Sequence, residues 1–133
     1  QDDGCGVRIV GPQSWAHDAF RGLNLSYLPS LPPAGEVGLV SQSPGLSCTI
    51  IDYVTNAQCG FSHVIDPGFE QVLTVADYVD MLAFDRKTRC IVLYLESFQQ
   101  PRKLLSAIRL AAANKPVNLT KRRPDPGLRR HCH

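Results

Sequence analysis

Two groups of polar residues lie where this chain could do chemistry. Ser41, Gln42 and Ser43 end one apolar run, and Glu96 ends another at residues 93–95. Hydroxyls, an amide and the N–H groups of a following helix can hold an anion such as phosphate, and a carboxylate can orient an imidazole or hold a cation. Open α/β sheets bind ligands at the carboxyl ends of their strands. We therefore expect both groups to lie on one ligand-binding edge.

Each group also has a structural interpretation. Ser43 can be the N-cap of a helix that begins at Pro44, and Glu96 can be a solvated strand end. The sequence has no Walker A lysine and no G-x-G-x-x-G, so direct binding of a nucleoside triphosphate is not indicated. His63 lies in the apolar run 61–65 and is interpreted as a packing or surface residue of a strand.

Composition excludes several other function classes. The net charge is +2 with a local basic excess near the C-terminal end, so no nucleic-acid partner is predicted. No apolar run has the length of a membrane span, and no signal peptide precedes the first apolar stretch. The five cysteines form no C-x-x-C pair, and His131 and His133 lack an orienting scaffold, so no metal is predicted. We expect reduced thiols and a cytoplasmic protein.

Regular elements that could position the polar groups begin at residue 35. A strand is predicted at 37–41, followed by a helix with Pro44 in its first turn and Gly60 at its left-handed end. A strand at 61–65 follows. Thr74 is a predicted N-cap, with Asp77 completing an acidic capping box. The later elements are predicted at residues 89–95 (a strand buried on both faces), 101–114 (a helix) and 117–120 (a strand).

This alternation predicts an α/β fold of flavodoxin-like type, a parallel sheet with helices on both faces. Residues 1–34 hold little apolar material and 13–23 are polar, so we expect an irregular N-terminal arm or the tail of a preceding domain. The main domain is expected at 35–121, and a basic, mobile tail at 122–133. The chain begins without an initiator Met, which suggests a processed chain or a fragment.

Several segments together resemble the NDP-forming acyl-CoA synthetases. Residues 6–12 (GVRIVGP) are similar to the end of the CoA-binding domain in that family. Residues 37–43 (VGLVSQS) resemble the first strand and turn of its succinyl-CoA-ligase-like, flavodoxin-like domain. The similarity continues at residues 75–77, 85–88, 93–96 and 115–117. Within the family, the resemblance is greatest to the synthetase-like region of bacterial protein lysine acetyltransferases.

The resemblance implies specific roles for the two polar groups. Members of the family interconvert acyl-CoA, phosphate and ADP or GDP with the acid, CoA and a nucleoside triphosphate through a phosphohistidine. Ser41, Gln42 and Ser43 would form the turn that faces the phosphate. Glu96 would contact and orient the histidine. A dianionic phosphate favours a helix N-terminus, and a carboxylate favours the imidazole N–H that it faces, so these roles are physically consistent.

The resemblance also implies a CoA-binding side. At some positions, however, the sequence differs from the pattern of the family. Gly11, Pro12 and Gln13 would lie on the CoA side, with CoA as the cofactor and acyl-CoA or phosphate as the ligand. Pro44 replaces the usual glycine and offers no N–H to a phosphate. The histidine loop of the family would fall just beyond His133. The frame of the family is present, while polar site positions are altered.

Three hypotheses follow. The chain is a fragment or degenerate relative of such a synthetase, non-catalytic alone and acting as a scaffold that binds CoA or phosphate. Alternatively, it is a working ligase subunit that obtains the missing parts from further domains or subunits. The third possibility is a regulatory or protein-interaction module of a synthetase-like lysine acetyltransferase. The sequence does not identify the acyl group, the nucleotide, the partner chain or the oligomeric state.

Overall fold

The computed structural model describes residues 14–25, 32–68, 70 and 72–122. In that part of the chain the elements are, in order, β1 (Trp15–Asp18), β2 (Leu23–Leu25), β3 (Ala34–Ser41), α1 (Pro44–Asn56), β4 (Phe61–Asp66), α2 (Val75–Phe84), β5 (Cys90–Leu95), α3 (Pro101–Ala112) and β6 (Val117–Lys121). None of the helices described is long and apolar enough to cross a membrane.

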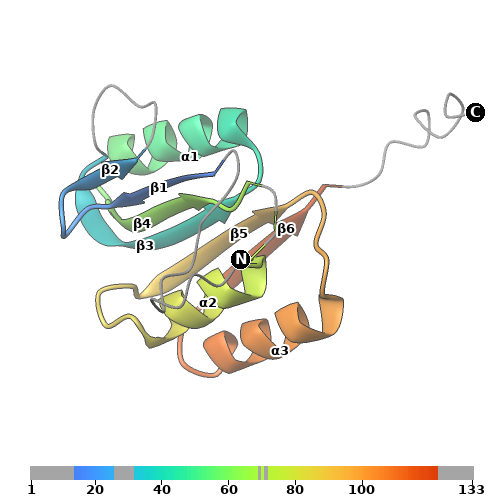
Figure 1. Ribbon diagram of the computed structural model, residues 1–133. Helices are drawn as coiled ribbons and strands as arrows, with labels where there is room; N and C mark the ends of the chain where they lie inside the picture. The colour runs from blue at the N-terminus through green and yellow to red at the C-terminus, as the bar shows by residue number, and fades with distance from the viewer. Residues whose placement is uncertain (1–13, 26–31, 69, 71, 123–133) are drawn as a thin grey trace, which may run out of the picture.

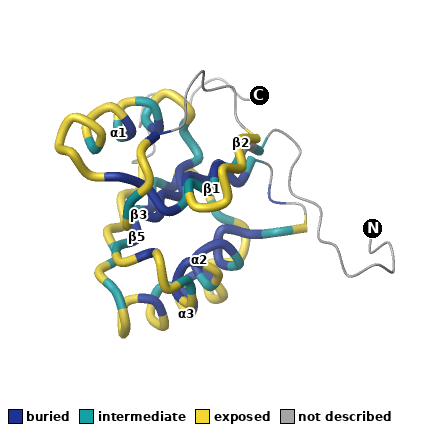
Figure 2. Tube along the Cα trace, turned by 90° about the vertical axis from the view of Figure 1, so that its left-hand side faces the viewer, coloured by how far each residue is buried: buried dark blue, intermediate teal, exposed yellow. Residues whose placement is uncertain are grey.

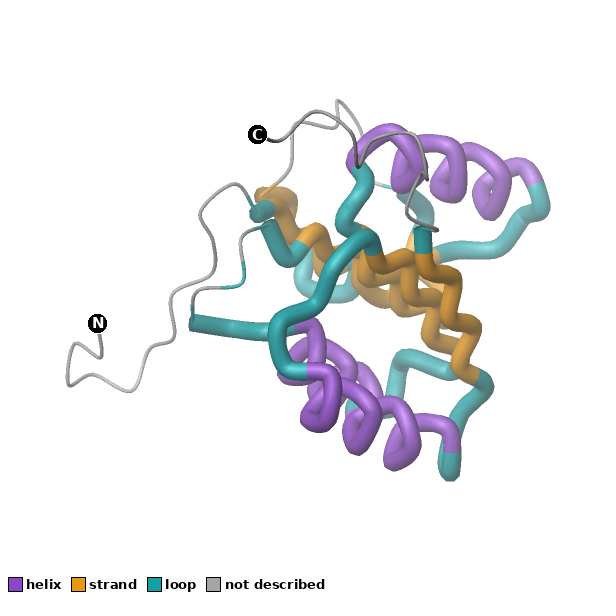
Figure 3. The backbone as a smooth tube through the Cα atoms, turned by 90° about the vertical axis from the view of Figure 1, so that its right-hand side faces the viewer, coloured by secondary structure: helices purple, strands orange, loops and turns teal. Residues whose placement is uncertain are grey.

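The strands form one sheet in the order β2-β1-β4-β3-β5-β6. β3, β4, β5 and β6 pair in parallel, whereas β1 is antiparallel to both β2 and β4. If only the four parallel strands are numbered along the chain, their order in the sheet is 2-1-3-4. The flavodoxin-like order, 2-1-3-4-5, begins in the same way. Figure 1 shows α1 on one face and α2 and α3 on the other, and Figure 3 shows the strands between them. The predicted fold class is confirmed.

The core has two parts because the sheet is covered on both faces (Figure 2). Side chains along a strand alternate between faces, so Leu39 packs towards α1 while its neighbour Val40 packs towards α2 and α3. β5 was predicted to be buried on both faces, and the structure differs from that prediction. Alternate residues of β5, from Ile91 to Leu95, are fully buried, but Val92 on the α1 side is only half-buried. One helix, α1, covers that face less completely than two helices cover the other.

The structure corrects the prediction made for the N-terminal segment. Residues 13–23 were expected to be irregular, but they contain β1 and the start of β2. β1 pairs with the free edge of β4, with Ala16 opposite Ile65 and Asp18 opposite His63. All three residues of β2 are exposed, so no buried alternation marks this strand in the sequence. Within residues 1–34, the expected arm or tail of a preceding CoA-binding domain, residues 1–13 and 26–31 lie outside the described part of the chain.

Local capping sets the helix boundaries, and one of the predicted helix ends was wrong. The Asp77 carboxylate accepts hydrogen bonds from the N–H and hydroxyl of Thr74, both at 2.8 Å, and the bond from the N–H is the one that the predicted acidic capping box requires of Asp77. Gly60, however, does not take the left-handed position after α1. Gln58 takes it, with a φ of 57°. Gly60 is needed for close approach, since a Cβ there would lie 2.4 Å from the carbonyl oxygen of Ala34.

Candidate functional site

The carboxyl edge of the sheet brings the two polar groups together as predicted. β3 and β5 are neighbours, with Ser41 opposite Tyr94, and the N–H of Gln42 donates to the Tyr94 carbonyl at 3.1 Å. The chain leaves β3 towards α1 on one face and leaves β5 towards α3 on the other. This is the topological switch point, where open α/β sheets form their ligand crevice.

The turn between β3 and α1 is held by its two serines. Ser41 is fully buried, and its Oγ lies 3.2 Å from both the N–H and the carbonyl oxygen of Ser43. Ser43 is the N-cap, because its Oγ accepts a hydrogen bond from the Leu46 N–H at 3.4 Å. The capping interpretation of Ser43 is therefore observed. Its backbone also accepts from the Ser47 hydroxyl at 2.9 Å. These hydrogen bonds hold the turn to the start of α1, and the first turn of α1 contains no acidic residue.

Gln42 links three loops of this edge. Its Oε1 accepts from the N–H groups of Glu96, at 2.7 Å, and Ser97, at 3.0 Å. Its Nε2 donates to the Glu70 carboxylate at 3.1 Å. The side-chain amide of Gln42 thus holds the β5–α3 loop in place. Gln42 therefore has a positioning role, because both its amide oxygen and its amide nitrogen are hydrogen-bonded to other residues of the protein.

Glu70 is a site residue that sequence reasoning missed. It is 7% exposed, and its second oxygen accepts from the Val75 N–H at the start of α2, at 3.3 Å. Burial raises the pKa of Glu70, although hydrogen bonds from the Val75 and Gln99 backbone and from Gln42 oppose that shift. An acidic residue in the loop just before a helix was the available signal, because helix N-termini stabilise carboxylates.

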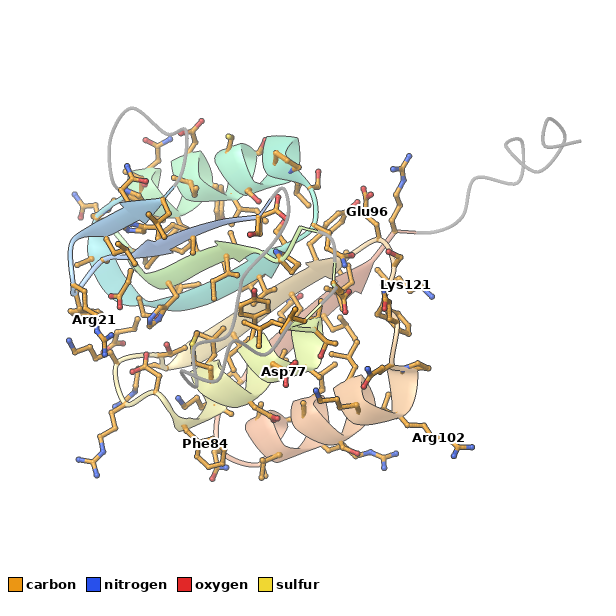
Figure 4. All side chains as sticks on the ribbon, in the orientation of Figure 1. Arg21, Asp77, Phe84, Glu96, Arg102 and Lys121 are labelled. Atoms are coloured by element: carbon orange, nitrogen blue, oxygen red, sulfur yellow. The ribbon has the colours of Figure 1, made fainter. Side chains whose placement is uncertain are left out.

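Glu96 lies at the edge but its carboxylate is paired. The Arg122 guanidinium lies 3.2 Å from Glu96 Oε1, and the Arg122 N–H donates to the Leu95 carbonyl at 3.0 Å. Figure 4 shows Glu96 beside Lys121, where β5 and β6 end. The Glu96 side chain is 38% exposed, so the pair can open to an incoming group at small cost.

The start of α2 adds a second charged pair. Lys103 Nζ lies 2.7 Å from the Asp77 carboxylate. Burial alone would raise the pKa of Asp77, but the hydrogen bonds from Lys103 and Thr74 outweigh it and lower that pKa. This pair joins α2 to α3 beside the candidate site.

Gly11, Pro12 and Gln13, predicted to lie on the CoA side, are outside the described part of the chain. So are His131 and His133, which were not predicted to bind a metal. Among the described residues, no group of His, Cys, Asp and Glu could hold a metal ion. The structure therefore brings together Ser41, Gln42, Ser43 and Glu96, and adds Glu70 and Arg122 to them.

The chain matches one family along most of its length. The family model described as the succinyl-CoA ligase like flavodoxin domain covers residues 34–129. That range contains the parallel sheet, the three helices and every described residue of the candidate site.

Curated relatives and solved structures agree with that match. The chain is 27% identical over 117 residues to acetate–CoA ligase [ADP-forming] I of Archaeoglobus fulgidus, covering 87% of this chain and 17% of that protein. It is 28% identical to the alpha subunit of acetate–CoA ligase [ADP-forming] II of Pyrococcus furiosus, over 84% of this chain and 24% of the subunit. The chain thus spans 17% to 24% of these relatives.

Solved structures show the same relationship in three dimensions. The dinucleotide-forming acetyl-coenzyme A synthetase 1 of Ca. Korarchaeum cryptofilum, in complex with phosphate and ADP, superposes with a TM-score of 0.78 at 26% identity. The alignment covers 90% of this chain and 26% of that one. PH0766 from Pyrococcus horikoshii OT3 gives a TM-score of 0.79, again at 26% identity, over 87% of this chain and 27% of that one.

Proposed function

Since the chain belongs to the succinyl-CoA-ligase-like flavodoxin domain family, we propose that it supplies the phosphate-facing edge of an NDP-forming acyl-CoA synthetase. The reaction of the whole assembly would interconvert acyl-CoA, phosphate and ADP or GDP with the acid, CoA and a nucleoside triphosphate. One observation supports this most: the Gln42 amide joins the β3–α1 turn to the backbone of Glu96. The helix N-terminus and the carboxylate are thereby held in one arrangement.

The proposed chemistry of this edge is electrostatic. The N-terminal N–H groups of α1 carry a partial positive charge, which favours a phosphate or phosphohistidine. Pro44 removes one donor, and the N–H groups of Leu46 and Ser47 are bonded to Ser43, so the Gly45 N–H would face the anion at the positive end of α1. Glu96 would accept the N–H of an incoming imidazole in place of the Arg122 guanidinium. Arg122 would then be released towards the phosphate.

We propose that the chain alone is non-catalytic and acts as a scaffold that binds phosphate or CoA. It spans 17% of the A. fulgidus ligase, so the other parts of such an enzyme have no counterpart within this match. Further domains or subunits would supply them. One of the P. furiosus relatives is itself an alpha subunit, in keeping with an enzyme assembled from several chains.

A second candidate is a regulatory or protein-interaction module of a synthetase-like lysine acetyltransferase. The observation in its favour is the Glu96–Arg122 pair, which neutralises the carboxylate that a ligase would direct at histidine. In that role the edge would bind a ligand without turnover.

The phosphate site can be tested by amide NMR on the 133-residue chain titrated with inorganic phosphate. We expect shifts of the Gly45, Leu46 and Ser47 amides. Ser43→Asp keeps an N-cap but adds a negative charge, so the phosphate affinity should fall at least about tenfold. Ser43→Asn is the neutral control and should change it less than about twofold. Unchanged affinity in Ser43→Asp contradicts the proposed site.

Turnover is a separate test. The chain is incubated with acetate, ATP and CoA, and acetyl-CoA is measured. No product is expected from the chain alone, and formation of acetyl-CoA would refute the non-catalytic role.

A further inference from the structure

The outer side of β6 is a free strand edge. β6 is the last strand in the order of the sheet, and among the described strands it pairs with β5 alone. The Arg122 N–H donates to the Leu95 carbonyl of β5 at 3.0 Å, and successive residues of a strand direct their backbone groups to alternate sides. The N–H and C=O groups of Val117, Leu119 and Lys121 therefore point away from β5. Such a row of backbone groups is a template for pairing with another strand.

The residues of β6 do not block this pairing. Protected edge strands contain a proline, a bulge or inward-pointing charges. β6 has the sequence VNLTK, and its register with β5 is regular from Val117 to Lys121. Its single charge is on Lys121, at the end of the strand. Four of its five residues are exposed, so a further strand can approach it.

An apolar groove lies next to this edge, between α3 and the end of β6. It has a volume of about 190 Å³. Its walls are mostly apolar side chains, which include Leu95, Phe98, Leu104, Leu105, Ile108 and Leu119. Leu105 and Leu119 are 49% and 48% exposed. The volume is below the roughly 300–1,000 Å³ of small-molecule sites, so the groove has the size for one or two protein side chains.

The surroundings of the groove are basic. Residues 97–122 contain six basic residues and no acidic one. Of these, Arg102, Arg109 and Lys121 are exposed and form no ion pair within the described part of the chain. Figure 4 shows Arg102 on α3 and Lys121 at the end of β6. A second copy of this chain would bring the same positive charges to the edge, so an acidic segment is the better electrostatic complement.

We propose that the free edge of β6 binds an extended, acidic segment of a partner polypeptide as an additional strand of the sheet. The backbone of the segment would bond to the outward N–H and C=O groups of β6. Its apolar side chains, at alternate positions, would enter the groove beside Leu119, and its acidic residues would meet Arg102, Arg109 and Lys121. The inference does not rest on the proposed function, because it needs only this strand edge and the charge around it.

Amide NMR on the 133-residue chain tests the proposal with two short synthetic peptides. One alternates glutamate with valine and leucine, and the other has lysine in place of each glutamate. We expect the acidic peptide to shift the amides of Leu119 and Lys121, and the basic peptide to bind at least about tenfold more weakly. Equal binding of the two peptides refutes an acidic partner. No shift of the β6 amides refutes the site.

Variants of Leu119 locate the binding. Leu119→Ser removes the apolar side chain from the groove and should weaken the acidic peptide at least about fivefold. Leu110→Ser, at a similarly exposed position outside the groove, is its control and should change the affinity less than about twofold. Leu119→Pro also removes an outward N–H without touching the bonds to β5, so it should weaken binding further. Binding that survives both Leu119 variants overturns the proposal.

Two other outcomes also contradict it. Shifts of the β6 amides that grow with the concentration of the chain, without any peptide, would identify a second copy as the occupant. Peptide shifts confined to residues 45–47 would report binding at the β3–α1 turn. Because the two sites have different amides, failure of this proposal is distinguishable from failure of phosphate binding.

Discussion

Two regions of the molecule treat their polar side chains in opposite ways. At the carboxyl edge, Gln42 and Glu70 are bonded to each other and to backbone N–H groups. His17 on β1 and Tyr78 on α2 each keep a buried side-chain atom that has no hydrogen-bond partner among the described residues. A satisfied network stabilises and rigidifies the structure, whereas a buried polar atom left unpaired costs stability. The carboxyl edge thus holds a fixed geometry, and the pairing of polar atoms is less complete at β1 and in α2.

Among the variants that test this contrast, Glu70→Ala should have the largest effect. The change leaves the Val75 N–H and the Gln42 amide without their acceptor in a buried place. We expect the free energy of unfolding to fall by about 2–3 kcal/mol in urea denaturation. Glu96→Ala, an exposed carboxylate at the same edge, is the control and should change it by less than about 0.5 kcal/mol. Equal effects would mean that the Glu70 network does not hold the edge.

The pH dependence of Glu70 gives a second test. Its pKa in the folded chain is raised above the ordinary 4.5, so the folded state binds more protons than the unfolded state between those two values. Stability from this group is therefore complete below pH 4.5 and is lost as the pH rises through the raised pKa. Glu70→Gln should remove that loss, which a difference between the two stability profiles will show. Identical profiles would contradict the raised pKa.

A matched pair of hydroxyl deletions compares the two regions directly. Ser47 is fully buried, and its hydroxyl donates to the Ser43 carbonyl at 2.9 Å, so Ser47→Ala should cost about 1 kcal/mol. The Tyr78 hydroxyl has no described partner, so Tyr78→Phe should be neutral or stabilise by up to about 1 kcal/mol. Thermal unfolding without added ligand measures both. A loss in Tyr78→Phe similar to that in Ser47→Ala would contradict the contrast.

The smallest expected effect is at the rim of the carboxyl edge. Arg122→Gln removes an ion pair whose side chains are 60% and 38% exposed. Solvent screens such a pair, so the free energy of unfolding should change by less than about 0.5 kcal/mol in urea denaturation. The same variant should weaken phosphate binding in the NMR titration if Arg122 turns to the anion. A large stability loss would show that Arg122 is instead part of the fixed network.

Most of the fold was predictable because its signals are local. Apolar periodicity placed β3 and β5, and the Thr74 and Asp77 pair marked the start of α2. β1 and β2 were missed, since a short strand with exposed residues becomes regular only by pairing with the edge of β4. Gly60 was misassigned because its approach to the Ala34 backbone depends on how two distant segments pack.

The candidate site, like the fold, was predicted from the sequence only in part. Its turn residues and Glu96 were found because each directly follows an apolar strand, and strand ends of a parallel sheet share one edge. Their partners were not found. Gln42 bonds to Glu70 across 28 residues, and Glu96 to Arg122 across 26. No sequence spacing encodes those contacts, which require the loops of several strands to converge.

The sequence by itself determined the order of strands and helices from β3 onward, the capped start of α1 and the sharing of one edge by Ser43 and Glu96. These properties depend on residues a few positions apart and on the right-handed connection of parallel strands. Only the tertiary structure decided which polar atoms are paired and which are left open. His17 is buried because β1 pairs with the edge of β4, and that pairing is a property of the assembled sheet.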